Sequence, residues 1–135
     1  MYQTSLPSVF AAGNVVIVYD LADWVSQEGF AAGRNAALYA AGSLRAPRRR
    51  IDIRGSSIVR LFSPQFITGE GDVTVYFRVA RPIERHCRVV AEHGLFSQTR
   101  RYVRPGEMNE IHLTRDDLRR LPESVTSVTI DVVEA

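Results

Sequence analysis

The sequence predicts a mainly β protein, in which a strand and a helix over residues 1–45 precede an immunoglobulin-like antiparallel β-sandwich over residues 46–135. Two observations predict this class. Residues 26–41 are rich in alanine and have helical spacing, whereas after Gly42 apolar and polar residues alternate with period two between frequent turn signals. With 135 residues, 45% of them hydrophobic, the chain can form one ordinary domain, or one small domain with an appendage.

A short apolar run near the start predicts the first strand. Residues 9–12 are typical of a strand that is buried on both faces of a parallel sheet, and Gly13 then allows a tight turn or a close approach to a ligand. Asn14 brings a polar side chain to the carboxyl end of this strand, where open α/β sheets bind ligands. Gly13 and Asn14 are therefore candidate binding residues, with a plain turn after a core strand as the alternative.

The next element is a helix of about four turns over residues 26–41. Ser26 is a suitable N-cap, Glu28 places a favourable negative charge in the first turn, and Gly42 is a plausible stop. The apolar and small residues that recur at helical spacing are Phe30, Gly33, Ala37 and Ala40. Gly29 and Gly33, four residues apart, predict together with Ala32, Ala36 and Ala37 a face that packs closely against a sheet rather than a binding site.

Six or seven short strands are predicted after a linker at residues 42–50, which contains Pro47. Those that the pattern places are residues 58–62, 73–79, 87–92, 96–104, 109–113 and 128–133. A short helical turn interrupts them, because Thr114 and Asp117 have the spacing of a capping box. Leu118 and Leu121 are expected to pack beneath this turn, which crosses from one sheet to the other.

The charge pattern argues against a nucleic-acid partner. All 17 basic residues are arginine, but the net charge is only +2, and the 15 acidic residues are interspersed with the arginines. The run of arginines at residues 48–50 is expected to be a solvated linker, with nucleic-acid or phosphate binding as the alternative.

Cysteine and histidine chemistry is also restricted. Cys87 is the only cysteine, so an internal disulfide is impossible, and a buried, unreactive thiol in a cytoplasmic protein is expected. His86, His93 and His112 lack metal-ligand spacing, and no membrane span or signal peptide is expected. No residue is predicted to be catalytic or to bind a metal.

Residues 4–14, TSLPSVFAAGN, resemble the T-x-x-P-x-V-F-A-A-G-D signature of FAD-dependent pyridine-nucleotide oxidoreductases of the thioredoxin reductase type. A closer match is the branch of NAD(P)/FAD-dependent dehydrogenases associated with anaerobic glycerol-3-phosphate dehydrogenase and with opine and amino-acid dehydrogenases. Its pattern resembles V-F-A-C-G-N-V-L-x-V-x-D-L-V-D-x-V-S-x-E-G, which residues 9–29 follow at most positions. A C-terminal β-domain follows in these proteins, so the resemblance covers nearly the whole chain.

The resemblance implies FAD as cofactor. Asn14 stands where the signature has an acid that hydrogen-bonds the flavin ribityl chain, and Gly13 precedes it. The helix that follows implies that the backbone amides of Ser26 and Gln27 face the flavin ring. The candidate cofactor-binding residues are therefore Gly13, Asn14, Ser26 and Gln27.

The G-x-G-x-x-G motif that binds the ADP part of FAD is not found in these residues. The resemblance therefore implies the C-terminal portion of an FAD-dependent oxidoreductase, not catalytic alone, that shares its FAD with domains elsewhere on the polypeptide or on a partner chain of a hetero-oligomer. Two alternatives remain. One is a non-catalytic protein-interaction module, with a face formed by Tyr76, Arg78, Arg100, Arg101 and Tyr102, and the other is an inactive truncated fragment.

Overall fold

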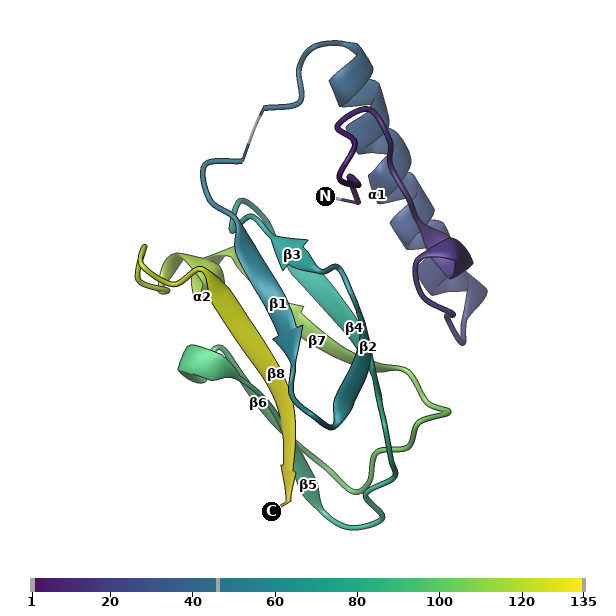
Figure 1. Ribbon diagram of the computed structural model, residues 1–135, viewed down its shortest axis with the longest axis vertical. Helices are drawn as coiled ribbons and strands as arrows, with labels where there is room; N and C mark the ends of the chain where they lie inside the picture. Colours follow the sequence, from purple (N-terminus) through teal and green to yellow (C-terminus); the bar gives the residue numbers. More distant parts are fainter. Residues whose placement is uncertain (1, 46, 135) are drawn as a thin grey trace. The chain divides into compact units, whose positions relative to one another are not determined.

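The computed structural model describes residues 2–45 and 47–134 (Figure 1). The chain divides into two compact units, an N-terminal unit, Met1–Arg48, and a β unit, Arg49–Ala135. The predicted boundary between residues 45 and 46 and the observed division after Arg48 both fall within the linker at residues 42–50.

The N-terminal unit consists of a long helix with an irregular segment along it. A single 3-10 turn, η1 at Gly13–Val15, precedes the helix α1 at Ala22–Ala40. Phe10 packs edge to face on Tyr39, with 6.1 Å between ring centroids. The segment thus runs from the C-terminal part of α1 toward its start, as Figure 1 shows.

The prediction of a strand at residues 9–12 is wrong. Phe10 forms an isolated antiparallel bridge with Gln3, and Thr4 N–H donates to the Val9 carbonyl at 2.9 Å. A parallel strand needs neighbours on both edges to satisfy its backbone groups. In this chain the preceding residues fold back and bond to the segment instead.

The end of α1 agrees with the prediction, whereas its start does not. Gly42 has φ +67°, its N–H donates to the Tyr39 carbonyl, and Ser43 N–H donates to the Leu38 carbonyl, which is the Schellman pattern. At the other end the helix begins four residues earlier than predicted. Leu21 is its N-cap and makes no side-chain cap bond, so the prediction of Ser26 as the N-cap is wrong.

The β unit is built from eight strands in the described residues. They are β1 (Ile51–Gly55), β2 (Val59–Ser63), β3 (Phe66–Ile67), β4 (Val73–Val79), β5 (Cys87–Ala91), β6 (Phe96–Arg100), β7 (Asn109–Leu113) and β8 (Ser127–Glu134). Between β5 and β6 lies the 3-10 turn η2 at Glu92–Gly94, and between β7 and β8 lies the short helix α2 at Arg115–Arg119. The patterned strands are confirmed, although the predicted strand at residues 96–104 ends at Arg100, and the sequence pattern does not predict β1 or β3.

These strands form two sheets. The larger has the order β3-β1-β8-β5-β6 and the smaller has the order β2-β4-β7. The pairing is antiparallel except between β1 and β8, which are parallel with Ile53 opposite Val128. The prediction of wholly antiparallel sheets is therefore wrong at this pair, because a strand from the start of the unit lies beside one from its end.

One hydrophobic core lies in the β unit, and both sheets contribute to it. Phe77 and Ile111 come from the smaller sheet, and Val89 and Ile130 come from the larger one. The capping box at Thr114 is confirmed, since its hydroxyl accepts from Asp117 N–H and the Asp117 carboxylate accepts from Thr114 N–H. The turn α2 connects the two sheets, and Leu118 and Leu121 pack into the core as predicted.

Candidate functional site

Gly13 and Asn14 lie in the 3-10 turn that leads from the N-terminal segment toward α1. Gly13 is buried and has φ +74°, a conformation that favours glycine. A Cβ atom at this position would lie 3.1 Å from Val25 Cγ1 on α1. Asn14 is exposed, and its Oδ1 accepts a hydrogen bond of 3.2 Å from Tyr19 N–H. The predicted tight turn is therefore present, and Val25 of α1 lies close to Gly13.

A buried carboxylate completes this region. Glu28 is only 2% exposed, its Oε2 accepts from Gly13 N–H at 2.5 Å, and its Oε1 accepts from the Tyr19 hydroxyl at 2.5 Å. Gly13, Asn14, Tyr19 and Glu28 thus form one hydrogen-bonded network that closes the loop at residues 13–19, called here the 13–19 loop. The prediction that Glu28 acts as a first-turn charge is wrong, because it lies in the second turn and faces this loop.

Ser26 and Gln27 occupy positions different from those predicted. Both are exposed and lie inside α1, where the Ser26 hydroxyl donates to the Ala22 carbonyl at 3.0 Å. The amides that a helix leaves without intrahelical partners are those at its start, near Ala22 and Asp23. The α1 residues that contact Gly13 are Val25 and Glu28, so Ser26 and Gln27 are not brought to the turn by these contacts.

Exposed apolar side chains occur both in the 13–19 loop and on α1. Large hydrophobic side chains are exposed in the 13–19 loop, with Val15 at 84%, and on the helix, with Phe30 at 81%. Nothing lies within 4 Å of the Cβ positions of Gly29 and Gly33, so the predicted close packing of this face against a sheet does not occur within the described residues. Stable monomers rarely leave large contiguous apolar patches uncovered.

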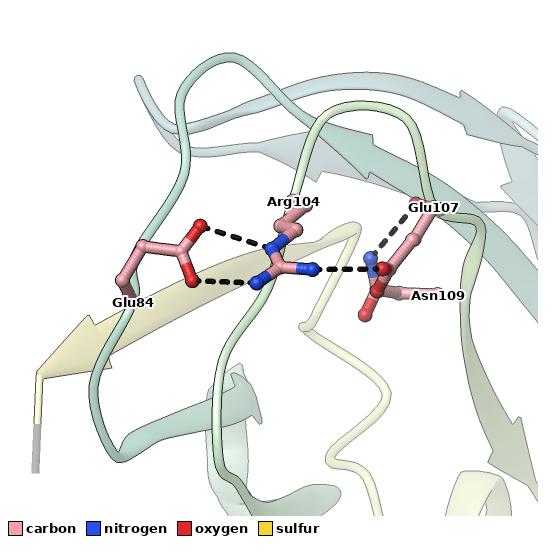
Figure 2. A network of polar contacts seen from close by, with 4 residues as sticks. All are labelled: Glu84, Arg104, Glu107 and Asn109. Carbon is pink, nitrogen blue, oxygen red and sulfur yellow. Dashed lines mark hydrogen bonds and ion pairs between the residues drawn. The ribbon is translucent and has the colours of Figure 1, made fainter.

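In the β unit, a polar network joins the loop before β5 to the loop after β6 (Figure 2). Arg104 donates to both carboxylate oxygens of Glu84, at 2.9 and 3.0 Å, and lies 3.8 Å from Glu107. The Arg104 guanidinium also lies over the Tyr102 ring, 4.4 Å from its centroid. The hydrogen bond from Arg104 lowers the pKa of Glu84. These exposed residues hold the loop before β5 against the loop after β6.

The five residues predicted for an interaction face do not share one surface element. Tyr76 and Arg78 lie on β4 of the smaller sheet, and Tyr76 is buried. Arg100 ends β6 of the larger sheet, and Arg101 and Tyr102 follow it in an exposed loop. The alternation of apolar and polar residues predicts β4 and β6 as strands, but it does not show that they belong to different sheets.

The pocket at His93 and the thiol of Cys87 are poor candidates for a cofactor site. A pocket of about 90 Å³ lies among His93, Asp117 and Arg120, well below the roughly 300 Å³ at which pockets for organic cofactors begin. Cys87 is fully buried, as predicted, and burial raises the pKa of its thiol. Within residues 2–45 and 47–134, no group of three or more His, Cys, Asp or Glu side chains could hold a metal ion.

In the described part of the chain, no helix is long and apolar enough to cross a membrane. Comparison of the chain with protein-family models, with curated proteins and with solved structures gave no significant match in any of the three.

Proposed function

We propose that this chain supplies part of the FAD pocket of an NAD(P)/FAD-type, thioredoxin-reductase-like oxidoreductase. The N-terminal unit, a helix with an irregular segment along it, is a portion of the FAD-binding domain, and the β unit is an immunoglobulin-like sandwich for assembly. The domains that bind the ADP part of FAD and NAD(P) lie outside these 135 residues, on the same polypeptide or on a partner in a cytoplasmic hetero-oligomer. The chain is not catalytic by itself.

The observation that carries this proposal is the uncovered apolar surface around the motif residues. Val15, Val16 and Val18 in the 13–19 loop are exposed, within residues that resemble a flavin-binding signature. Open space surrounds the Cβ positions of Gly29 and Gly33, and such small residues would let a further domain pack closely on the helix. Further domains that bind the flavin would bury this surface, which supports a shared site over an independent module.

In this proposal the flavin carries the hydride or electron chemistry, and the protein binds and orients it. Asn14 hydrogen-bonds the ribityl chain, and Gly13 permits the turn. The start of α1 offers a partial positive charge that stabilises negative charge on the reduced flavin. Ser26 and Gln27, whose backbone amides the resemblance implies for the flavin, lie inside α1, so the amides that the helix start can offer belong to residues near Ala22.

Visible absorption spectra of the chain alone and of its complex with native partners test the proposal. We expect the flavin band in the complex and not in the isolated chain. In the complex, Gly13→Val is expected to weaken FAD binding about ten- to a hundredfold, because φ +74° and the nearby Val25 methyl both disfavour a β-branched side chain.

Gly71→Val is the matched control, because Gly71 is exposed and open space surrounds the position of its Cβ. It is expected to leave the flavin content unchanged. Absence of flavin from both preparations, or full flavin retention by the Gly13 variant, contradicts the proposal.

A further inference from the structure

Glu28 is a carboxylate placed where burial is costly unless its oxygens accept hydrogen bonds. It is 2% exposed and lies on the face of α1 that also carries the buried Ala32. Neither composition nor helical spacing assigns a role to a buried acid in this position, and the function proposed above does not use it.

We infer that Glu28 is a positioning residue, which holds the Gly13–Asn14 turn in the geometry that the cofactor site requires. The identity of the cofactor rests on the function proposed above. The fixing of the turn by Glu28 is a property of this chain alone and can be tested without the cofactor.

The first step is that one side chain holds both ends of the 13–19 loop. The Glu28 oxygens accept separately from Gly13 N–H and from the Tyr19 hydroxyl, each at 2.5 Å. These partners are six residues apart in the chain but are held on the same carboxylate. Removal of the carboxylate therefore frees the loop at both ends together.

The second step links this carboxylate to Asn14. Tyr19 is anchored by its hydroxyl on Glu28, and its backbone N–H donates to Asn14 Oδ1 at 3.2 Å. Because a backbone N–H can only donate, the Asn14 amide is oriented with its oxygen toward the loop. Its Nδ2 then offers two N–H groups to a ligand oxygen, so Asn14 acts as a donor.

This orientation selects the kind of ligand group at Asn14. A hydroxyl oxygen or a carbonyl oxygen accepts from Nδ2. The ribityl hydroxyls implied by the resemblance belong to this class, because a hydroxyl can accept as well as donate. The acid in the signature accepts hydrogen bonds from the ribityl hydroxyls, whereas Asn14 donates to them.

Amide hydrogen exchange in the full chain, labelled with nitrogen-15, tests the positioning role. In Glu28→Leu we expect the Gly13 and Tyr19 amides to exchange about ten- to a hundredfold faster, the effect of losing a hydrogen bond to a charged group. In Glu28→Gln we expect most of the protection to return, because Oε1 still accepts from Gly13 and Nε2 can donate to the Tyr19 hydroxyl oxygen.

Arg34→Leu is the matched control, an exposed position on the same helix with the same new side chain. It is expected to leave both exchange rates unchanged. Tyr19→Phe serves as a second variant if the leucine variant does not fold, and it should speed exchange at Tyr19 while leaving the Gly13 amide protected.

Any of three results overturns the inference. The first is an unprotected Gly13 amide in the wild-type chain, and the second is equal exchange of the Gly13 and Tyr19 amides in Glu28→Leu and Glu28→Gln. The third is an unchanged exchange rate of the residue 19 amide in Tyr19→Phe. In the assembled complex, Glu28→Leu should lose FAD and Glu28→Gln should keep it. A wild-type complex without flavin contradicts the proposed function, and the exchange rates then still decide the role of Glu28.

Discussion

Arg104 shows how a single side chain can fix a local arrangement at the surface. It holds Glu84 by two hydrogen bonds, and both residues are in loops rather than strands. These loops also form the isolated bridge between Ile83 and Val103. Exposed ion pairs contribute little to stability in general, but a bidentate pair between two loops restricts both of them.

The pKa of Glu84 gives the prediction at this scale. Because the hydrogen bond from Arg104 lowers this pKa in the folded state, the pair stabilises the fold above the ordinary glutamate pKa of about 4.3. That contribution is lost as the pH falls through the lowered value. We expect Arg104→Met to raise the pKa of Glu84 toward its usual range, measured by NMR titration of the side-chain carboxyl carbon.

Arg101→Met is the control for this titration, since Arg101 is an exposed arginine three residues away in the same loop. It should leave the Glu84 titration unchanged. If Glu84 titrates alike in both variants and in the wild-type chain, the hydrogen bonds to Arg104 do not persist in solution.

Single residues were predictable only where their partners are close in sequence. Gly42 bonds to Tyr39 and Asp117 bonds to Thr114, each three residues away, so turn and cap chemistry predicts both. Glu28 meets Gly13 fifteen residues away and Tyr19 nine residues away. The path of the 13–19 loop decides those contacts, and no local pattern encodes it.

At the scale of elements, local signals determined which strands could be found. β4 and β7 agree with their predicted bounds, because alternating residues are flanked by turns. β1 alternates in the same way through Ile51 and Ile53, but it follows a run of arginines directly, without a turn signal. β3 has only two residues, too few for any periodicity.

The start of α1 differs from the prediction because Leu21, its N-cap, has no side chain that could cap a helix.

Two leucines of the smaller sheet provide the prediction at this scale. Leu113 on β7 is 1% exposed, whereas Leu61 on β2 is 55% exposed. We expect Leu113→Ala to lower the free energy of unfolding of the β unit by about 2–5 kcal/mol, through lost burial and a residual cavity. Leu61→Ala should change it by no more than about 0.5 kcal/mol.

Chemical denaturation followed by the far-ultraviolet signal of the strands measures both values. The deleted atoms are the same in the two variants, so only burial differs. Equal losses of stability would mean that β2 is covered in solution or that β7 does not lie in the core.

At the scale of the whole molecule, the chain is two compact units joined near Arg48. The change from helical spacing to alternation falls near Gly42, and the division lies in the linker that follows. The pairing of sheets was beyond the sequence, because period two marks a strand but does not name its neighbours. The parallel pair β1 and β8 is the clearest case, since its members lie at opposite ends of the β unit.

Limited trypsin digestion tests the division. Arg45 and Arg48 are exposed and lie at the junction, so we expect early cleavage after them and a resistant product that begins at or near Arg49. Substitution of both by glutamine should slow the release of this product. Early cleavage at Arg60 or Arg88, within strands, would contradict the division, as mass spectrometry of the products would show.

The place of β8 in its sheet has a consequence for synthesis on the ribosome. β8 lies between β1 and β5, so the larger sheet has no continuous hydrogen-bonded ladder until residues 127–134 have left the exit tunnel. Before that, β1 and β5 present unpaired inner edges that can bond to other nascent chains. The β unit therefore folds after translation of its last strand, and chaperones that shield strand edges should bind the chain while it is still being made.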